Sequence, residues 1–472
     1  MTVKTVLIAC DTFAPDHNGS AVFARNLACG LQERGYEVHV IAPAVSKLYG
    51  TFREQHDGIP LVVHRLKSYR LPFHPTQRFV SPLGLTKRIF GLTQAIKPDV
   101  VHIQSHINVG HHAATAAAKG HIKLVATNHV DAENLVENVL LAPKFLRRFL
   151  AELLLKDAGS VFKAASAVIA PTTRSAQLLS SAIPNLEVIT VSGGVDLSRF
   201  LKVPEADQKF RKISYVGRLD REKHVYVLLE ALAKVDTSIT LDLIGYGSQH
   251  AELVSLANEL GISKRVRFFE DLTDSQVVQR LGKASAFVMP SIQELQSMAT
   301  LEAMAAARPI LAADSMALPG LVESGVNGFL FKPDSAVDLA AKIAELFDLD
   351  AKTFKKMGAA SRQRAKLHDL AKSISNYERI YSGLPILSTT TDDDSEALEP
   401  TVGERLTNLV KLGSKSIEKG ANGVLERLDG VRGAVSETFT DVRFTIERRS
   451  KRMSKRISSS LRKALERIRR DD

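Results

Sequence analysis

Two glutamates set eight positions apart are the residues of this sequence best placed to do chemistry. Glu294 follows an apolar run that stops at Pro290, and Glu302 lies inside the helix-forming segment that comes next. Eight helical residues span about 12 Å at 1.5 Å per residue, which is the scale of a sugar diphosphate with its ribose. One carboxylate could therefore contact a hexose and the other a ribose, while free N–H groups at the helix N-terminus would face the phosphates. For this spacing taken alone, the alternative is a surface helix with two solvated glutamates.

The elements that must position these residues are short apolar runs that alternate with helical stretches. Helices are expected at 20–34, with Ser20 as the N-cap, and at 222–234. The segment 68–84 is too irregular for a helix or strand. It is either a lid, an acceptor contact or a loop packed on the core. Apolar strands joined by helices predict parallel strands in open, doubly wound α/β sheets. Strands are expected at 4–9, 37–42, 61–65, 99–103, 123–127, 167–170, 187–191, 213–216, 240–244, 265–269, 286–289, 310–312 and 328–331.

The alternation breaks near residue 195 and then begins again, which predicts two Rossmann-like domains facing a cleft. We place the first domain at 1–195 and the second at 196–365. A closing helix at 366–382 is expected to pack back toward the first domain. A linker at 383–400, rich in Thr and Asp, has the composition of a disordered segment. The remainder, 401–472, is expected to form a basic amphipathic helical tail.

The basic character of the chain is a property of this tail. The net charge is +11, and twelve Lys and Arg face only two acidic residues between Arg443 and Arg470. Apolar residues recur there at helical spacing, a pattern suited to an anionic membrane surface. The alternatives are a solvated tail and a self-associating helix. Nucleic acid is not expected, because only Phe444 is aromatic near the basic run. A second basic helix is expected at 143–156, to lie on an anionic interface or to face the core.

Composition also bounds the location of the protein. Cys10 and Cys29 have no metal or redox spacing, so a reducing cytoplasm is the simplest setting. The first apolar run predicts a strand rather than a signal peptide. No apolar run approaches the ~20 residues of a membrane span. A cytoplasmic protein that does not cross the membrane is therefore expected.

Further candidate residues stand where strands end and helices begin. Gly19 opens the first helix, Gly217 precedes Arg218 and Lys223, and Gly245 and Gly247 flank Tyr246. Glycines there admit close approach by an anion, and the two cations could bind a phosphate.

A histidine group in the first half suggests a metal site, but it lacks an acidic partner at ligand spacing. It comprises His102, His106, His111 and His112. No metal and no cofactor are therefore expected. His129, just past a strand end, is the better single candidate for a place at the cleft.

Taken together, these pieces resemble the family-4 retaining glycosyltransferases, which have the two-domain GT-B fold. The resemblance covers roughly residues 1–382. It implies that the domain at 1–195 is the acceptor side and that the domain at 196–365 binds the nucleotide sugar. The matching pieces, in order, are the Gly19-Ser20 loop, Gly194-Val195-Asp196 with Phe200, Gly217-Arg218-Leu219 with Glu222-Lys223, Gly245-Tyr246-Gly247, Pro290-Ser291, and Glu294 with Glu302 followed by Ala303-Met304-Ala305.

The resemblance implies roles for individual residues. Glu302 would bind the ribose hydroxyls, Glu294 would contact the donor sugar, and His129 would lie against that sugar. Arg218 and Lys223 would stabilise the departing diphosphate, where negative charge develops. The implied catalytic residues are thus Glu294, His129, Arg218 and Lys223, and the implied donor-binding residues are Gly19, Gly217, Arg218, Lys223, Gly245, Gly247, Ser297, Met298, Ala299 and Glu302.

Three departures from the family pattern bear on specificity. Leu295-Gln296 stands where Phe-Gly is frequent, His17-Asn18 replaces a glycine before Gly19, and Glu270 stands where glycine is common. The form Glu-Leu-Gln-Ser looks like the branch that contains diacylglycerol glucosyltransferases and other glycolipid synthases.

The resulting hypothesis is a hexosyltransferase that moves a hexose from UDP-glucose or GDP-mannose to a lipid acceptor. The basic helices would hold it peripherally at the inner face of the cell membrane. Two alternatives stay open: transfer to a soluble acceptor, such as an inositol phosphate or a glycan, and a non-catalytic membrane-binding adaptor.

Overall fold

A computed structural model describes residues 3–16, 18–70, 78–129 and 155–387 of the chain. All of them belong to one compact unit, Met1–Leu398. The expected basic helix at 143–156 lies almost wholly outside the described residues, and the tail at 401–472 lies wholly outside them. No helix among the described residues has the length and apolar character needed to span a membrane.

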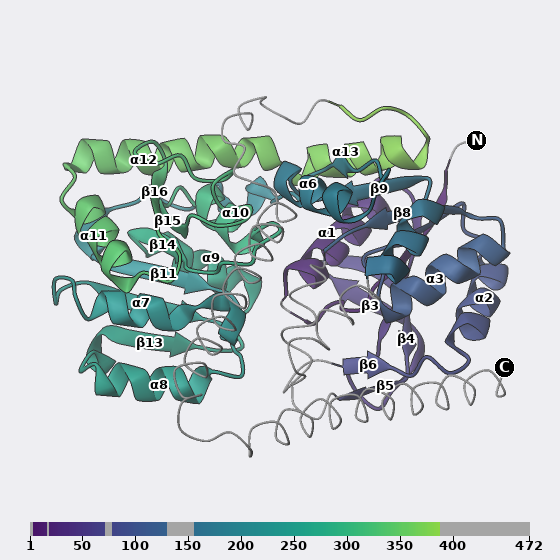
Figure 1. Cartoon of the computed structure of the whole chain (residues 1–472), viewed down its shortest axis with the longest axis horizontal. Helices are drawn as coiled ribbons and strands as arrows, with labels where there is room; N and C mark the ends of the chain where they lie inside the picture. The colour runs from purple at the N-terminus through teal and green to yellow at the C-terminus, as the bar shows by residue number, and fades with distance from the viewer. Residues whose placement is uncertain (1–2, 17, 71–77, 130–154, 388–472) are drawn as a thin grey trace, which may run out of the picture. The chain divides into compact units, whose positions relative to one another are not determined.

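An eight-stranded sheet forms the first half of the described chain (Figure 1). Its strand order is β10-β9-β8-β7-β1-β2-β4-β3, and every pair is parallel except β3 with β4. The strands are β1 Thr5–Ala9, β2 Glu37–Pro43, β3 Gly50–His56, β4 Ile59–Leu66, β7 Val100–Ile103, β8 Lys123–Thr127, β9 Ala167–Ala170 and β10 Ile189–Thr190.

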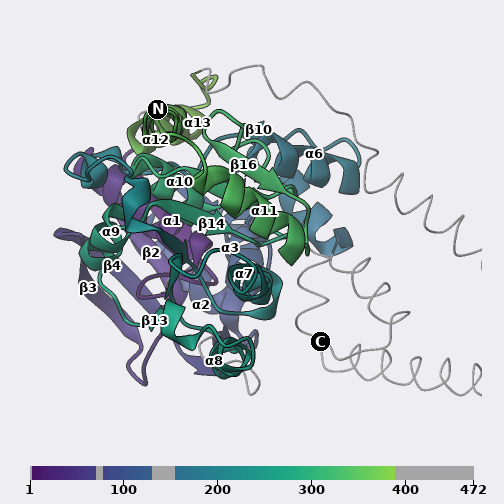
Figure 2. The ribbon, with the colours of Figure 1, turned by 90° about the vertical axis from the view of Figure 1, so that its left-hand side faces the viewer.

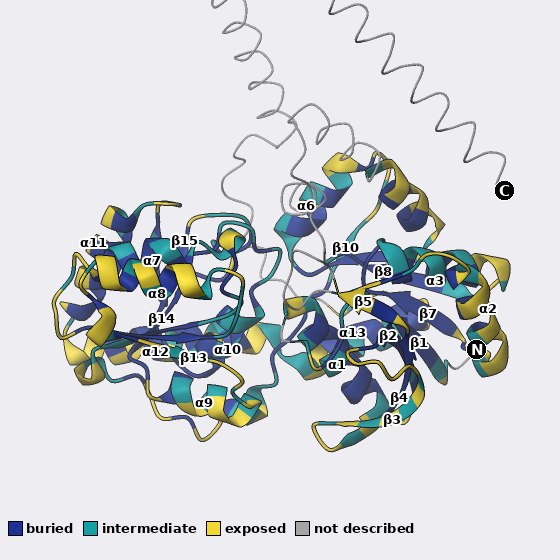
Figure 3. Cartoon of the chain, turned by 90° about the horizontal axis from the view of Figure 1, so that it is seen from below, coloured by how far each residue is buried: buried dark blue, intermediate teal, exposed yellow. Residues whose placement is uncertain are grey.

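Helices cover both faces of this sheet, as its apolar strands require. One core joins the sheet to α1 (Gly19–Glu33) and α13 (Leu370–Tyr381), the latter returning from the far end of the described chain. The other core joins the sheet to α2 (Leu85–Ile96) and α3 (Asn108–Lys119). Helix α6 (Thr173–Ala182) follows β9. In Figure 3 the central strands β8, β7, β1 and β2 are mostly buried, whereas the outer side of α2 is exposed.

A six-stranded parallel sheet, in the order β13-β12-β11-β14-β15-β16, forms the second half. Its strands are β11 Lys212–Val216, β12 Thr240–Ile244, β13 Val266–Phe269, β14 Ala286–Met289, β15 Ile310–Ala313 and β16 Gly328–Phe331. The helices around it are α7 Val225–Leu232, α8 His250–Glu259, α9 Asp274–Gly282, α10 Met298–Ala305, α11 Ala336–Phe347 and α12 Ala351–Ala365. Short 3-10 turns lie at Leu197–Phe200, Gln208–Phe210, Arg221–Lys223, Ser263–Arg265 and Lys366–His368. The predicted class, doubly wound α/β, is therefore confirmed.

Three expectations about individual elements are wrong. Strand β3 lies at the edge of the sheet, beside β4 (Figure 2). It was not expected, because its sequence is polar and only alternate residues are partly buried. The segment 68–84, expected to hold no element, contains β5 (Ser68–Arg70) paired with β6 (Arg78–Val80). Helix α1 is capped by Asn18, whose Oδ1 accepts from the Ala21 N–H, rather than by Ser20.

The helix expected at 222–234 is in fact interrupted. His224 has a φ of 51° and separates the 3-10 turn at Arg221–Lys223 from α7. The imidazole of His224 bonds to Asp334 and lies 3.3 Å from the Tyr226 hydroxyl. These contacts to distant and neighbouring side chains hold the bend, which periodicity alone could not reveal.

Candidate active site

Glu294 and Lys223 form the central ion pair of the candidate site. Lys223 Nζ lies 2.7 Å from Glu294 Oε1, and Glu294 is only 8% exposed. Glu294 lies in the loop that follows β14, and its backbone carbonyl accepts from the Ala317 N–H at 3.1 Å. The 3-10 turn after β11 brings Lys223 to the same place. Two segments 71 residues apart thus put a cation beside the first glutamate of the pair.

Helix α10 begins four residues after Glu294, as the spacing of the two glutamates predicted. Ser297 is its N-cap, with Oγ accepting from the Thr300 N–H at 3.3 Å. Met298 and Ala299 form the first turn, so their N–H groups have no acceptor within the helix. Because free N–H groups and the helix dipole favour anions, this end of α10 suits a phosphate.

Arg218 is held by carboxylates of its own loop. Its guanidinium bonds to Asp220 Oδ2 at 2.6 Å and to Glu222, and its backbone carbonyl accepts from the Tyr215 hydroxyl at 2.8 Å. Burial opposes its charge, but Glu222 and Asp220 raise the pKa of Arg218 overall. Arg218 is therefore a fixed cation. A diphosphate would have to share it with these two acids.

Glu302 stands at the start of a chain of charges that crosses between the two halves. Its Oε1 lies 3.5 Å from Arg199, which lies 3.4 Å from Asp274. Asp274 in turn lies 3.0 Å from Arg25 of α1. Burial raises the pKa of Glu302, and Arg199 partly offsets this rise. A half-buried carboxylate of this kind is well suited to accept hydrogen bonds from hydroxyl groups.

Gly217, Gly245 and Gly247 are needed for the packing of two loops against each other. A Cβ on Gly245 would lie 2.0 Å from the Gly217 carbonyl oxygen, and one on Gly247 would lie 2.4 Å from the Leu219 backbone. Gly217 and Gly245 also have φ of 154° and 139°. These glycines therefore have a structural reason besides the predicted approach of a ligand, and that approach stays a prediction.

His129 and Gly19 are the two predicted site residues of the first half. The His129 ring lies 4.7 Å from the Phe23 ring, and Nε2 lies 3.0 Å from Gln104 Oε1. Burial lowers the pKa of His129 to about 4, so its imidazole is neutral at pH 7. A Cβ on Gly19 would lie 3.8 Å from Met298 Cγ. Gly19 therefore adjoins α10, as the phosphate-loop assignment requires.

The four histidines of the suspected metal group have partners within the first half. His102 is fully buried and bonds to the Tyr381 hydroxyl at 2.7 Å and to Thr127 Oγ1 at 2.8 Å. His106 packs on Phe162, His111 pairs with Asp157 at 3.2 Å, and His112 bonds to Thr86. Within the part of the chain that the structure describes, no group of three His, Cys, Asp or Glu side chains could hold a metal ion.

Sequence reasoning missed three residues of this region. Arg199 and Asp274 were given no role, although they link Glu302 to Arg25. Gln296 was noticed only as a departure from the family pattern, yet its side chain bonds to three residues of the first half or its exit. The signal available for Gln296 was its unusual residue type, whereas an isolated Arg or Asp gives none.

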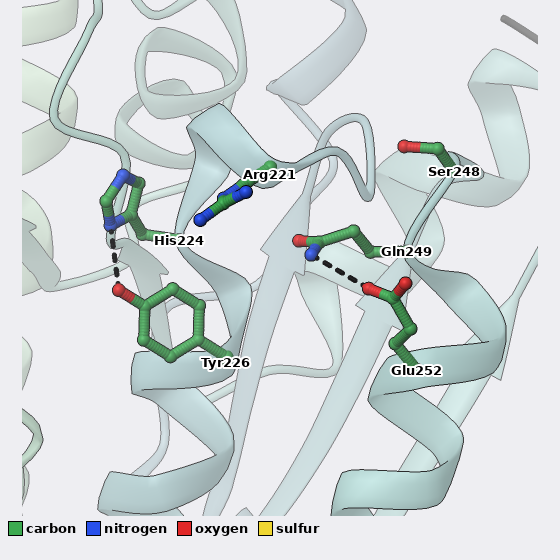
Figure 4. Close-up of a pocket in the computed structure, with 6 residues that line it drawn as sticks. All are labelled: Arg221, His224, Tyr226, Ser248, Gln249 and Glu252. Atoms are coloured by element: carbon green, nitrogen blue, oxygen red, sulfur yellow. Dashed lines mark hydrogen bonds between the residues drawn. The ribbon is translucent and has the colours of Figure 1, made fainter. Parts of the chain in front are cut away.

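A cavity of about 650 Å³ adjoins the same two loops (Figure 4). It lies between the starts of α7 and α8 and contains none of the predicted site residues. Its lining is Arg221, His224, Tyr226, Ser248, Gln249 and Glu252.

Two family models match most of the described chain. The family model Glycosyltransferase Family 4 matches residues 17–199, and the model Glycosyl transferases group 1 matches residues 198–364. An alpha-monoglucosyldiacylglycerol synthase from Acholeplasma laidlawii is 25% identical over 344 residues, covering 69% of this chain and 84% of that protein. A D-inositol 3-phosphate glycosyltransferase from Mycolicibacterium gilvum (strain PYR-GCK) is 28% identical over 364 residues, covering 72% and 79%.

Solved structures show the same fold. Sucrose-phosphate synthase from Thermosynechococcus elongatus aligns with a TM-score of 0.65 at 18% identity, over 80% of this chain and 98% of that one. Anabaena HepE in complex with UDP and glucose aligns with a TM-score of 0.63 at 19% identity, over 81% and 100%. Since the two family models together span residues 17–364 and the sheets have the matching architecture, the chain belongs to the family-4 glycosyltransferases of GT-B fold and is a hexosyltransferase.

Proposed function

We propose that the protein transfers a hexose from UDP-glucose or GDP-mannose to a lipid acceptor at the cytoplasmic face of the membrane. The observation that carries the proposal is the ion pair of Lys223 with Glu294, whose charged atoms lie 2.7 Å apart. Glu294 lies in the loop that leads directly into the N-terminus of α10. Lys223, Arg218 and the N–H groups of Met298 and Ala299 provide positive charge for a diphosphate. Glu294 provides an acceptor for a sugar hydroxyl.

In the proposed reaction, the bond between the anomeric carbon and the β-phosphate oxygen breaks as the acceptor hydroxyl attacks the same face of the sugar. The electron pair of that bond goes to the diphosphate, and the acceptor proton moves to a departing phosphate oxygen. Lys223, Arg218 and the helix N-terminus lower the barrier because they are in place before the charge develops. Because these protein groups can balance the charge, we propose that no divalent cation is required. Activity in excess EDTA should then equal activity in its absence.

Two observations favour a lipid acceptor. One is the 25% identity to the Acholeplasma laidlawii alpha-monoglucosyldiacylglycerol synthase over 84% of its length. The other is the basic run between Arg443 and Arg470, which suits an anionic surface. The 28% identity to a D-inositol 3-phosphate glycosyltransferase favours a second candidate, a soluble inositol phosphate acceptor.

The test is donor turnover by the full chain. Radiolabelled UDP-glucose or GDP-mannose is offered with phosphatidylglycerol vesicles that carry diacylglycerol or phosphatidylinositol, and label is followed into the organic phase. Lipid labelling with one donor, lost in Glu294→Gln, would support the proposal. Label only in a water-soluble product when inositol phosphate is added would replace the lipid acceptor by the soluble one.

The membrane part of the proposal has its own matched variants. Neutralising Arg448, Arg449 and Lys451 to Gln should weaken binding to phosphatidylglycerol vesicles on the order of 100-fold, at about 1 kcal/mol per basic residue near the surface. The control neutralises Lys352, Lys355 and Lys356, which are exposed on α12. Equal binding by both triple variants would contradict attachment through the tail.

A further inference from the structure

The side chain of Gln296, in the loop between Glu294 and α10, forms hydrogen bonds with the first half of the molecule and the segment that leaves it. Its Oε1 accepts from the Gly193 N–H at 2.7 Å. Its Nε2 donates to the Pro171 carbonyl at 3.2 Å and to Ser192 Oγ at 2.9 Å. The carbonyl and both amide hydrogens are thus in use. The loop is further tied by the Thr172 hydroxyl, which donates to the Leu295 carbonyl at 2.9 Å.

These partners lie where the chain passes between the two halves. The first passage follows β10, and the second precedes α13. The two passages bond to each other, because the Val195 N–H donates to the His368 carbonyl at 2.7 Å and the Leu370 N–H donates to the Val195 carbonyl at 3.1 Å. Ser192 Oγ also lies 2.9 Å from His368 Nδ1. Gln296 therefore bonds directly to the point about which the halves would rotate.

Tight packing surrounds the Gln296 amide at Gly193. A Cβ added there would lie 2.8 Å from Gln296 Oε1, 3.1 Å from the Phe23 ring and 3.2 Å from the Met298 sulfur. Phe23 also contacts His129, the side chain expected to lie against the donor sugar. Phe23 therefore lies between His129, the first passage and the start of α10. A shift of Gln296 would move the N-terminus of α10 relative to His129.

We propose that Gln296 is a positioning residue that holds the N-terminus of α10 at a fixed orientation to the first half. This deepens the proposed function and rests on it. Transfer requires the anomeric carbon, held through the diphosphate by the second half, to meet an acceptor held by the first half. Small errors in such an alignment cost large factors in rate. Glycine at this position could make none of the three side-chain hydrogen bonds.

The kinetic test uses Gln296→Met, which keeps the volume of the side chain, and Gln296→Gly. We expect kcat to fall about 10-fold in both. The affinity for UDP, measured by calorimetry, should change less than about 2-fold, because Gln296 bonds to none of the residues that we expect to bind the donor. Gln363→Ala, an exposed glutamine on α12, is the control and should leave both unchanged. An equal loss of UDP affinity would overturn the proposal, because Gln296 would then act in donor binding.

The variant Gln296→Glu adds a second measurement, the pH dependence of kcat, which a change in packing alone would not alter. An ionised carboxylate still accepts from Gly193 but cannot donate to the Pro171 carbonyl, whereas a protonated one can. The ratio of its kcat to that of the wild type should therefore rise as the pH falls from 8 toward 5. A ratio that does not vary with pH would count against the hydrogen bonds as the cause.

An acceptor-independent measurement separates this inference from the proposed function. Spin labels on cysteines placed at Lys119 and Lys264, both exposed, report the distance between the halves, and the native Cys10 and Cys29 are buried. We expect a narrow distribution for the wild type with UDP and a broader one for Gln296→Met and for Gly193→Ala, which disturbs the same amide from the other side. Unchanged distributions would overturn the inference even if no acceptor had been found.

Discussion

The polar groups near the candidate site differ between the two halves of the molecule. In the second half the candidate groups are charged and paired: Lys223 with Glu294, and Arg218 with Asp220 and Glu222. In the first half the buried groups His102 and His129 are imidazoles whose pKa burial lowers to about 3 and about 4.

This contrast fits a division of roles between the halves. A diphosphate carries charge and needs fixed cations, whereas a sugar or an acceptor hydroxyl needs neutral partners that cost little to bury. The halves share an architecture, so the difference comes from the side chains at the strand ends rather than from the fold.

The largest effect should come from removing a charge from the paired groups of the second half. Lys223→Met should lower kcat/KM about 10²- to 10³-fold, because a cation placed for the leaving diphosphate is lost. The variant also leaves Glu294 buried without its partner, so its free energy of unfolding should fall by about 3 kcal/mol. Steady-state kinetics and urea denaturation measure the two effects.

The double variant Lys223→Met/Glu294→Gln separates these causes. It removes both charges, so most of the stability should return while activity stays low. Recovery of activity together with stability would show that Lys223 acts only as a partner for Glu294.

An intermediate effect is expected from the neutral imidazole of His102 in the first half. It should make the free energy of unfolding depend on pH. The pKa of His102 is about 3 in the folded protein against 6.5 as the reference value, so the unfolded chain takes up the proton first. Stability is therefore complete above pH 6.5 and is lost as the pH falls toward 3. Between pH 7 and pH 4.5 the loss from His102 alone should be about 3 kcal/mol.

His102→Gln tests this assignment, because glutamine keeps hydrogen-bonding capacity for Tyr381 and Thr127 but does not titrate. Its unfolding free energy, measured by urea denaturation at several pH values, should fall less steeply below pH 6.5. Parallel curves for the variant and the wild type would show that other groups cause the acid sensitivity. Because Tyr381 ends α13, the protection of this helix against hydrogen exchange, measured relative to the intrinsic exchange rate at each pH, should fall in acid in the wild type.

The smallest effect should come from the charges that connect the halves. Arg25→Met removes the 3.0 Å contact to Asp274 but keeps the apolar stem, and both side chains are partly exposed. A loss of about 0.5–1 kcal/mol in stability at low salt is expected, shrinking as salt screens the pair. Arg364→Met, whose partner Glu323 lies in the same half, is the control for rigidity between the halves. The two variants should differ in the spin-label distance distribution, and identical distributions would weaken the role of Arg25.

Much of the fold could be predicted because buried parallel strands consist of consecutive apolar residues, which are visible in the sequence. β8, β9, β12, β14 and β16 have the predicted limits, since each is bounded by turn residues and buried along its length. β3 and β5 could not be predicted, because an edge strand exposes one face and its polar residues resemble a loop. The break at His224 was hidden because it depends on Asp334, 110 residues away.

For the candidate site, the sequence by itself determined the residue types and their order: two glutamates eight apart, two cations after a strand and a helix N-terminus. These are local features, and their chemistry follows from the side chains. The tertiary structure decided which groups meet. It paired Lys223 with Glu294 across 71 residues and bonded Gln296 to Gly193, 103 residues away. Such contacts depend on how two sheets and their loops pack, which no local pattern encodes.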